Sequence, residues 1–418
     1  MHAVHFDEPW GAAVRHFEFL SDAQRDALFA VPPQPVRRRS DSGQLALALG
    51  ATFYSPGTRT TLALDAQRAA GIGTTSHVWC LEDSIPHEAV PRAQANVVAA
   101  LRSLGRRDRL PLLFVRVRTP EQVVEVTRQA GDAASFLTGF VLPKFRPGPE
   151  GEAWLQSVEQ ASALAGVRLY AMPVLEHEDL AWRESRADHL TAVRALLDAR
   201  RRSVLAVRVG GTDLCGLFGL RRDRDTTIWD VAVVRDMLAD VLNCFARRGD
   251  YVVSGPVWEH FAGNDRLFKS QLRQTPFENT RSLRLHTQLV RDDVDELLRE
   301  VALDRANGFS GKTVIHPTHV SVVNAMLAVT REEYDDALVV LAGREEGGVV
   351  RSPSGGKMNE LGPHALWDEQ VAARAAVYGV LAEPDGVVAL LDAGWRAAQQ
   401  AYGPGLGWTG APSALPVP

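Results

Sequence analysis

The sequence has few cysteines and no long apolar run. Its 418 residues include three cysteines, Cys80, Cys215 and Cys244, which are too few and too scattered for a disulfide framework or a cysteine-rich zinc site. No apolar run reaches the roughly 20 residues that a membrane helix needs. The first residues, MHAVHFDEPWG, lack the basic and apolar regions of a secretory signal. These absences predict a cytoplasmic protein in a reducing compartment, with no membrane partner.

The chain also lacks a strong excess of either charge. Its formal net charge is −5, so there is no general attraction to nucleic acid or to an anionic membrane. Arginine runs occur at Arg37–Arg39, Arg200–Arg202 and Arg221–Arg224, each with an aspartate within or close to it, and we interpret them as solvated faces. No HExxH, GxSxG or dinucleotide-binding glycine motif is present.

What the sequence does have is a regular alternation of short apolar runs with longer amphipathic segments. This alternation is typical of βα units with a parallel sheet. Eight repeats favour a closed TIM (β/α)₈ barrel over an open doubly wound sheet. The predicted strands are Ala51–Ser55, Ser76–Leu81, Leu112–Val117, Phe140–Pro143, Val167–Leu175, Ser203–Val209, Tyr251–Ser254 and Thr313–Ile315.

The chain extends beyond this barrel at both ends. We predict an N-terminal extension at residues 1–50 and a TIM-barrel domain at residues 51–330, with an insertion at about residues 255–286. Residues 331–402 are predicted to form a helical segment that serves as a lid or in oligomerisation. The Ser/Pro/Gly-rich stretch Arg351–Gly356 would be a flexible connection within that segment. Residues 403–418 are predicted to be a flexible tail.

Polar side chains follow the predicted strands at their C-terminal ends. In a TIM barrel these ends face one common mouth, where the active site lies. The residues at these positions are Arg59, Glu82, Asp83, Arg116, Lys144, Glu176, Asp213, Ser254 and His316. Because acids and bases converge on one mouth, the sequence predicts an active site there.

Two of these acids are candidate metal ligands. Glu176 ends the fifth predicted strand and Asp213 follows the sixth, and neighbouring strands lie about 4.8 Å apart. Two carboxylates at that spacing can share one hard cation, Mg²⁺ or Mn²⁺. The alternative makes Glu176 an ion-pair partner and Asp213 a turn or cap residue. Glu178 and Asp179 fit better as the first turn of the next helix.

The arginines suggest recognition of an acid. Arg59 lies where the first strand gives way to a helix, a position suited to a carboxylate or phosphate. Arg116 could donate to a carbonyl oxygen that becomes negative. The alternative for each is a salt bridge to Glu82 or Asp83. His316 could relay a proton, but a histidine that precedes a proline at a strand end is more often structural.

The segment Gly308–Thr313, GFSGKT, is similar to the end of a phosphate-binding loop. The first glycine of that motif would fall on Ala306, and the segment precedes a strand instead of following one. We therefore reject nucleotide binding at this segment.

Several phrases resemble the citrate lyase beta-subunit and HpcH/HpaI aldolase family. They occur in the order YSPGTR, CLEDSIPHEAVPRAQ, FVRV, VLPKF, MPVLE, GGTDL and GFSGKTVIHPTHVSVVN, from about residue 51 to residue 324. The chain looks similar to the divergent C–C bond lyase subgroup that is associated with tellurite-resistance and stress genes. Two phrases depart from the family pattern. The family's DLED is Cys80–Asp83 here, which loses the first acid, and VRVN is Val115–Arg118, which replaces an amide with a cation.

This resemblance implies a TIM barrel that binds Mg²⁺ through Glu176 and Asp213. It also implies catalysis or substrate binding by the residues Arg59, Glu82, Asp83, Arg116, Lys144, Gly211 and Thr212. Glu360, in the phrase GGKMNE, would reach the site of a neighbouring subunit in a homotrimer or homohexamer. The substrate would be a 2-oxo or hydroxy acid or an acyl thioester. Coenzyme A would enter as part of a thioester substrate and not as a bound cofactor, and the two departures put a coenzyme A thioester in doubt.

The expected reaction is a retro-aldol or retro-Claisen cleavage, or the reverse condensation. Arg116 and the metal would stabilise the enolate. The base would be Glu360, Glu82 or a water on the metal. One alternative is a catalytically silent barrel that binds a metabolite or a protein partner, which the departures favour. Another is an enolpyruvyl or phosphonate-type enzyme with the same barrel and metal arrangement.

Overall fold

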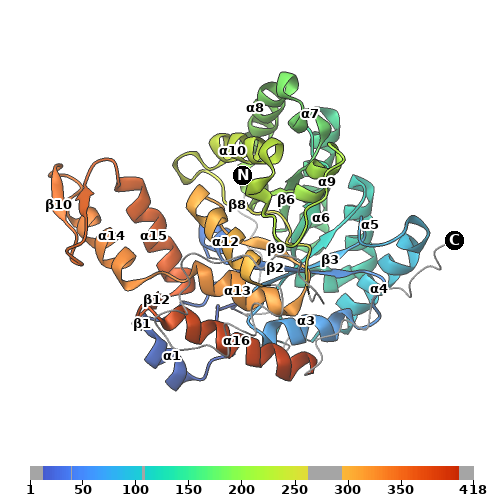
Figure 1. Ribbon diagram of the computed structural model, residues 1–418. Coiled ribbons are helices and arrows are strands. Elements are labelled where there is room, and N and C mark those ends of the chain that lie inside the picture. The colour runs from blue at the N-terminus through green and yellow to red at the C-terminus, as the bar shows by residue number, and fades with distance from the viewer. Residues whose placement is uncertain (1–12, 39, 106–108, 262–293, 404–418) are drawn as a thin grey trace.

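Eight parallel strands form a closed barrel at the centre of the molecule (Figure 1). The computed structural model describes residues 13–38, 40–105, 109–261 and 294–403. The strand order is β8-β7-β6-β5-β4-β3-β2-β9, and a parallel bridge between Gly255 and Lys312 joins β8 to β9. The strands are β2 (Ala51–Pro56), β3 (Ser76–Cys80), β4 (Leu112–Arg116), β5 (Leu137–Leu142), β6 (Tyr170–Leu175), β7 (Val207–Val209), β8 (Val253–Ser254) and β9 (Lys312–Val314). The predicted TIM barrel is confirmed, and each predicted strand overlaps one observed strand.

Helices cover the outside of the barrel. Thr119 caps α5 and Pro120 occupies its first turn, as the sequence predicts. The α-helices of this layer are α3 (Leu62–Gly71), α4 (Val90–Ser103), α5 (Pro120–Ala130), α6 (Pro149–Ala165), α7 (Glu178–Ala181), α8 (Arg183–Ala199), α9 (Gly211–Gly216), α10 (Ala232–Phe245), α12 (Asp295–Asn307) and α13 (Pro317–Leu327). Short 3₁₀ turns join them: η1 (His87–Ala89), η2 (Gly131–Phe136), η3 (Arg201–Ser203), η4 (Ile228–Asp230) and η5 (Arg247–Gly249). None of the described helices is long and apolar enough to cross a membrane.

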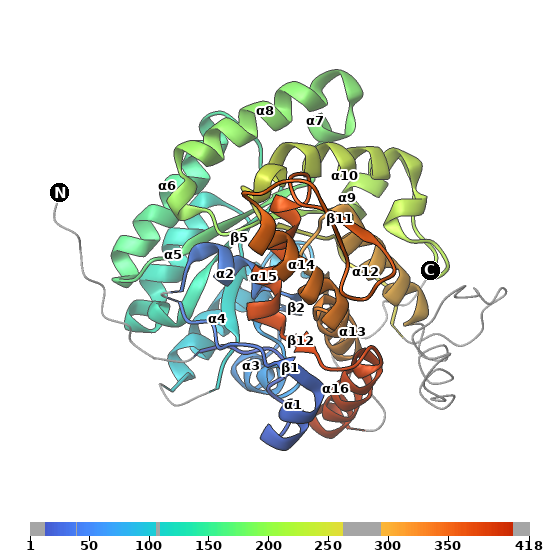
Figure 2. The ribbon, with the colours of Figure 1, turned by 90° about the vertical axis from the view of Figure 1, so that its left-hand side faces the viewer.

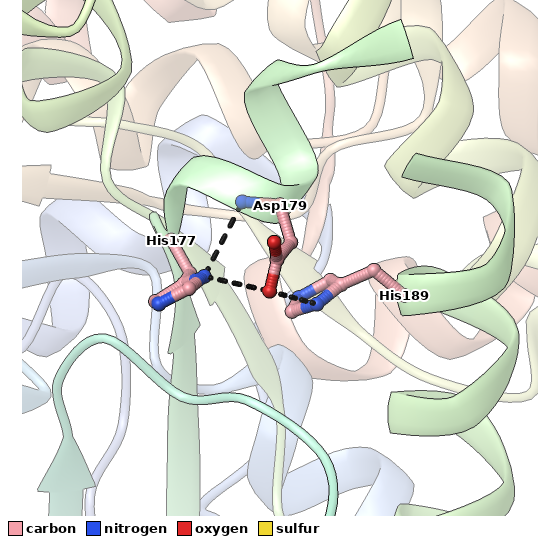
Figure 3. A group of neighbouring side chains, drawn as sticks. All are labelled: His177, Asp179 and His189. Carbon is pink, nitrogen blue, oxygen red and sulfur yellow. Dashed lines mark hydrogen bonds and ion pairs between the residues drawn. The ribbon is translucent and has the colours of Figure 1, made fainter. Parts of the chain in front are cut away.

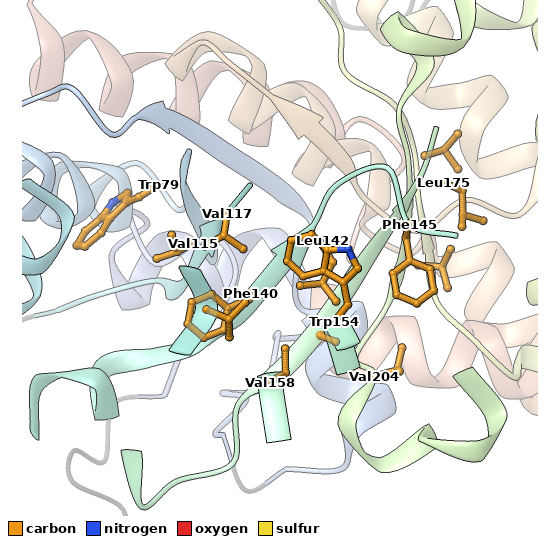
Figure 4. Packing of buried hydrophobic residues seen from close by; sticks show 14 of the residues in the cluster. Trp79, Val115, Val117, Phe140, Leu142, Phe145, Trp154, Val158, Leu175 and Val204 are labelled. Carbon is orange, nitrogen blue, oxygen red and sulfur yellow. The ribbon is translucent and has the colours of Figure 1, made fainter. Parts of the chain in front are cut away.

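The layer between strands and helices is a dense apolar core (Figure 4). Trp79 of β3, Phe140 of β5 and Trp154 of α6 belong to this core, and Trp79 and Phe140 are fully buried. Burial of each such side chain contributes about 1.5–3 kcal/mol to folding. This core fixes the strands, and it therefore fixes the positions of the side chains that follow their C-terminal ends.

The described parts of the N-terminal extension and of the C-terminal segment meet at one side of the barrel. The N-terminal extension forms α1 (Asp22–Leu28), β1 (Phe29–Val31) and α2 (Ser42–Leu47). Strand β1 pairs antiparallel with β12 (Val380–Leu381) near the other end of the chain. Both views place α1 and β1 beside α16 (Gly386–Tyr402) and β12 (Figures 1 and 2). The Tyr378 hydroxyl donates to the Leu47 carbonyl at 2.7 Å.

The segment after the barrel contains a β-hairpin that the sequence did not predict. Helices α14 (Arg331–Gly343) and α15 (Ala365–Tyr378) are separated by strands β10 (Val349–Arg351) and β11 (Met358–Glu360), which pair antiparallel. The stretch that we interpreted as a flexible connection is the turn of this hairpin, closed by Ser352 N–H donating to the Lys357 carbonyl at 2.9 Å. Most of the predicted insertion, residues 262–286, and the tail from residue 404 lie outside the described residues.

Candidate active site

Charged side chains from neighbouring strands gather at the C-terminal mouth of the barrel. Glu82 and Asp83 follow β3, Arg116 ends β4, Lys144 follows β5 and Glu176 follows β6. The parallel register places Cys80 of β3 opposite Arg116, and Arg116 opposite Val141 of β5. Because these strand ends lie at one level, their side chains meet, as the sequence predicts.

Arg116 is the centre of this cluster. Its Nη2 atom lies 2.8 Å from Glu82 Oε2, 3.2 Å from Asp83 Oδ2 and 3.0 Å from Glu176 Oε1. Burial alone would lower the pKa of Arg116, but the Glu176 carboxylate, with Glu82, raises that pKa above its usual range. The salt bridge to Glu82 or Asp83 that we considered for Arg116 is present. It holds the guanidinium in the barrel mouth.

Lys144 connects the same acids from the next strand. Its Nζ atom lies 2.8 Å from Glu82 Oε1, 3.2 Å from Asp83 Oδ2 and 3.7 Å from Asp213 Oδ1. The backbone of Lys144 has a φ of 48°, in the left-handed region that non-glycine residues seldom adopt. In this conformation its N–H donates to Glu176 Oε1 at 2.9 Å. Main chain and side chain of Lys144 thus contact different carboxylates.

Glu82 and Asp83 respond differently to the same surroundings. Glu82 is buried, and this burial raises the pKa of its carboxyl although Arg116 opposes the shift. Burial also acts to raise the pKa of Asp83. The hydrogen bond with Glu82 and the charges of Arg116 and Lys144 outweigh it, so that pKa is lowered. One acid of the pair therefore holds a proton more readily than the other.

Glu176 is the most buried acid of the mouth, with a side chain only 1% exposed. Burial raises its pKa to about 7, and the nearby Asp213 charge adds to that shift while Arg116 opposes it. The hydrogen bonds that Glu176 accepts from described residues all go to Oε1. Its Oε2 lies over Gly210, where an added Cβ would be 1.9 Å away. A larger residue at position 210 would displace this carboxylate.

Asp213 lies on α9, after β7, with a side chain 31% exposed. Gly211 packs closely, since an added Cβ would be 2.7 Å from Pro256 Cβ. Thr212 Oγ1 donates to Glu259 Oε1 at 2.5 Å. Gly211 and Thr212, predicted as substrate-binding residues, therefore hold α9 against the chain that follows β8.

The donor set fits a divalent cation. Glu82, Asp83, Glu176 and Asp213 carry four negative charges when ionised, and Arg116 and Lys144 carry two positive charges, which leaves a charge of −2. One divalent ion would balance that charge, and the free Oε2 of Glu176 together with Asp213 would supply oxygen ligands. Oxygen ligands of this kind suit Mg²⁺.

Arg59 lies in a different arrangement from the one considered in the sequence. Its Nε and Nη2 atoms donate to the two oxygens of Asp65, at 2.7 and 3.1 Å. Asp65 is a buried residue in the first turn of α3. Among the ion pairs of the described residues, Arg59 pairs with Asp65 and not with Glu82 or Asp83, the partners considered for it, because the aspartate six residues ahead lies within reach of the guanidinium.

Two other candidates have structural roles. His316 caps α13 with its Nδ1 atom, 3.4 Å from Thr318 N, and stacks on Phe261 with ring centroids 4.8 Å apart. Lys312 of the GFSGKT segment is buried against Glu300 at 2.6 Å and Asp304 at 2.7 Å. Its ammonium therefore holds α12 to the barrel, in agreement with the rejection of nucleotide binding there.

Two arginines near the mouth have contacts that the sequence does not predict. Arg118, interpreted as an extra cation in the site, instead donates to the backbone carbonyls of Leu81, Glu82 and Ile85, at 2.7–2.9 Å. Arg208 is buried inside the barrel, donates to Thr52 and Thr313, and lies over the Tyr54 ring. A charged residue in the apolar run VRV was the signal for Arg208.

Glu360 lies on β11, in the hairpin that projects at the left edge of Figure 1, far from β6 and α9. Among the described residues, no hydrogen bond or ion pair joins Glu360 to the charged cluster of its own chain. It would have to act on another copy if it acts in catalysis.

Comparison with known proteins agrees with this fold. A family model described as a C–C bond lyase of the TIM-barrel fold matches residues 43–380. A comparison with curated protein sequences gives no match. A citrate lyase from Burkholderia xenovorans LB400 has 17% identity and a TM-score of 0.56, covering 81% of this chain and 94% of that one.

Two further solved structures have lower scores. The protein CitE from Mycobacterium tuberculosis, in complex with magnesium, acetoacetate and coenzyme A, has 19% identity and a TM-score of 0.49, covering 79% of this chain and 99% of that one. A Haloferax volcanii malate synthase in a ternary complex with pyruvate and acetyl-CoA has 12% identity and a TM-score of 0.46, covering 85% and 96%.

Proposed function

Because the chain belongs to the C–C bond lyase family of the TIM-barrel fold, we propose that it is a Mg²⁺-dependent enzyme that cleaves or forms a carbon–carbon bond beside a carbonyl group. The proposed substrate is a 2-oxo or hydroxy acid or an acyl thioester. The observation that carries this proposal is the cluster of four carboxylates around Arg116 and Lys144 at the barrel mouth.

In this proposal Glu176 and Asp213 hold the metal. Bound Mg²⁺ supplies Lewis-acid polarisation of a substrate oxygen. Arg116 donates to the oxygen that becomes negative as the bond breaks, because its guanidinium keeps its proton and carries several donors. Such preorganised donors are worth a few kcal/mol of barrier. Lys144 and Arg59 position the substrate carboxylate.

Glu82 is the proposed base. Its buried carboxyl has a raised pKa and lies between Arg116 and Lys144. A carboxylate with a raised pKa accepts a proton more readily than an ordinary one, which suits a general base. Glu82 would take the hydroxyl proton of the substrate during cleavage and return it during condensation.

The hairpin supports a further part of the proposal, a homotrimer or homohexamer. It carries Glu360 and exposes Val349, Val350 and Met358, with Met358 57% exposed. In such an assembly the hairpin would bring Glu360 to the mouth of a neighbouring copy. Light scattering of the purified protein measures the number of subunits. A protein that is monomeric at all concentrations would contradict the proposed homotrimer or homohexamer.

The metal site is tested by calorimetric titration with Mg²⁺. We expect one Mg²⁺ per chain, and loss of binding in Asp213→Ala and in Glu176→Gln. Asp188→Ala, an exposed aspartate on α8, is the matched control and should bind as the wild type does. Absent Mg²⁺ binding, or binding unchanged in Asp213→Ala, would refute the metal site.

The reaction is tested with a panel of hydroxy acids and acyl thioesters, by release of pyruvate or of an acetyl thioester. Activity should fall by 100-fold or more in Arg116→Lys and in Glu82→Gln. If Glu360→Gln abolishes turnover and Glu82→Gln does not, the base is Glu360. If the protein binds Mg²⁺ but turns over no compound of the panel, the result would favour a catalytically silent barrel that binds a metabolite.

A further inference from the structure

A second group of metal-ligating side chains lies outside the charged cluster, on the turn that follows β6. His177 precedes α7, Asp179 lies in α7, and His189 lies on α8. Figure 3 shows the Asp179 carboxylate between the two imidazole rings. His177 Nδ1 is 3.1 Å from Asp179 Oδ2, and His189 Nδ1 is 3.7 Å from the same oxygen. All three candidate ligand atoms lie within 4.8 Å of one another.

From this arrangement we propose that His177, Asp179 and His189 form a second metal site, selective for a divalent transition metal such as Zn²⁺. Two imidazole nitrogens and one carboxylate oxygen suit such ions, whereas Mg²⁺ prefers oxygen alone. Three protein ligands leave the fourth tetrahedral position to water. This inference does not rest on the proposed lyase function.

The distances agree with one shared ion. Tetrahedral bonds of about 2.0 Å place two ligand atoms about 3.3 Å apart, and the two observed separations to Asp179 Oδ2 lie on either side of that value. The imidazole planes are nearly parallel, at 9°, with centroids 5.9 Å apart. A metal lies in the plane of each ring that binds it, so at least one ring turns about its side-chain bonds when the site fills.

The two histidines differ in how readily a metal could bind them. His177 Nδ1 accepts from Asp179 N–H at 3.3 Å and lies 3.1 Å from the Asp179 carboxylate, so a metal on this nitrogen would replace that hydrogen bond. His189 is 3% exposed and makes no hydrogen bond with the described residues. Burial lowers the pKa of His189, which keeps it neutral, the form that binds metals. A cation between the three groups would satisfy all of them.

Hydrogen bonds hold the turn that carries the site. Arg186 donates from Nε and Nη2 to the carbonyls of Leu180 and Ala181, at 2.8 and 2.9 Å. Ser185 Oγ donates to the Asp179 carbonyl at 2.9 Å. These bonds tie α7 to α8, so His177, Asp179 and His189 are held near one another before a metal binds.

The test is calorimetric titration of the chelator-treated full-length protein with Zn²⁺, in the presence of excess Mg²⁺. We expect one Zn²⁺ per chain. His189→Gln and Asp179→Asn should each weaken binding by more than about 100-fold, since loss of an outer-shell partner alone costs 10–100-fold. His87→Gln, which changes an exposed histidine on η1, is the matched control and should bind as the wild type does.

Asp213→Asn separates this site from the proposed Mg²⁺ site. It should lose Mg²⁺ and keep Zn²⁺. Loss of Zn²⁺ in Asp213→Asn would mean that Zn²⁺ occupies the barrel mouth, and it would overturn the inference. No Zn²⁺ binding, or equal binding in the wild type, His189→Gln and Asp179→Asn, would also overturn it. Asp179 is 46% exposed, so Asp179→Asn should fold even if His189→Gln does not.

Discussion

Glu176 is buried between an arginine that favours its charge and an aspartate that opposes it, which makes metal binding depend on pH. Its pKa is raised to about 7, and a protonated carboxyl is a poor ligand for Mg²⁺. We expect the apparent Mg²⁺ affinity to fall up to about tenfold for each pH unit below 7 and to level off above it. Calorimetry between pH 5.5 and 8.5 measures this, and constant affinity over that range would contradict it.

The raised pKa of Glu176 also makes the stability of the fold depend on pH. A carboxyl whose pKa rises on folding, from the ordinary 4.5 to about 7, destabilises the metal-free fold when it is ionised. The free energy of unfolding should therefore decline as pH rises from about 4.5 to 7, by on the order of 3 kcal/mol. Glu176→Gln should remove most of this decline, which serves as the control.

Gly210 makes room for the Glu176 carboxylate. An added Cβ would lie 1.9 Å from Glu176 Oε2, so Gly210→Ala must displace that oxygen. We expect loss of Mg²⁺ binding and a stability loss of about 1–3 kcal/mol, as for other overpacked sites. Gly216→Ala is the control. Gly216 ends α9, the helix that begins directly after Gly210, and no atom lies within 4 Å of the Cβ that the substitution adds. Calorimetry and urea denaturation compare the two variants, and equal Mg²⁺ binding would contradict the prediction.

For individual side chains, the sequence predicts the contacts of Arg116 and misses those of Arg59 and Arg208, for physical reasons. The ion pairs of Arg116 could be predicted because parallel strand ends share one level. The pairing of Arg59 with Asp65 depends on where the guanidinium turns after the strand, which the alternation of strands and helices does not specify. The burial of Arg208 depends on barrel closure, which brings Thr52 and Thr313 beside it.

At the scale of elements, Arg118 joins two βα turns. Its guanidinium donates to three carbonyls of the turn that holds Glu82 and Asp83. We expect Arg118→Ala to cost at least about 1.5–3 kcal/mol, the value of a hydrogen bond to a charged group. Amide exchange at residues 81–85 should become faster. Arg128→Ala, which removes an exposed ion pair on α5, should change neither quantity. Unchanged exchange in Arg118→Ala would contradict this role.

Element prediction succeeded where the pattern is local and repeated. Each barrel strand is a short apolar run next to an amphipathic helix, so the sequence signal for β2 to β9 needs no distant partner. The hairpin of β10 and β11 was missed because its strands have three residues each and are mostly exposed. Such strands show no apolar alternation, and the Ser/Pro/Gly-rich turn between them is similar to a flexible connection.

At the scale of the whole molecule, the N-terminal extension and the C-terminal segment share one core with the barrel interior. Phe17 and Trp395, from the two ends of the chain, belong to the same buried cluster as Phe114 of β4. The sequence predicted these ends as separate parts. Strands of two and three residues, about 350 positions apart in the chain, carry no sequence signal for the pairing of β1 with β12.

This arrangement predicts that a disruption at the chain ends destabilises the barrel as well. Leu381 of β12 is 2% exposed and belongs to this shared cluster, so Leu381→Asp places a carboxylate in the shared apolar core and should cost about 3–5 kcal/mol. Val233→Asp changes a residue of α10 that is 37% exposed and should stay within about 0.5 kcal/mol of the wild type. Urea denaturation measures both values.

Native-state amide exchange then shows how far the disruption extends. If the ends and the barrel unfold as one unit, β3 and α16 should lose protection together in Leu381→Asp, because both belong to the unit whose global stability has fallen. Val233→Asp should protect both elements as the wild type does. Faster exchange confined to α15 and α16, with β3 unchanged, would show instead that the C-terminal segment opens independently. That result would support the prediction that residues 331–402 form a lid.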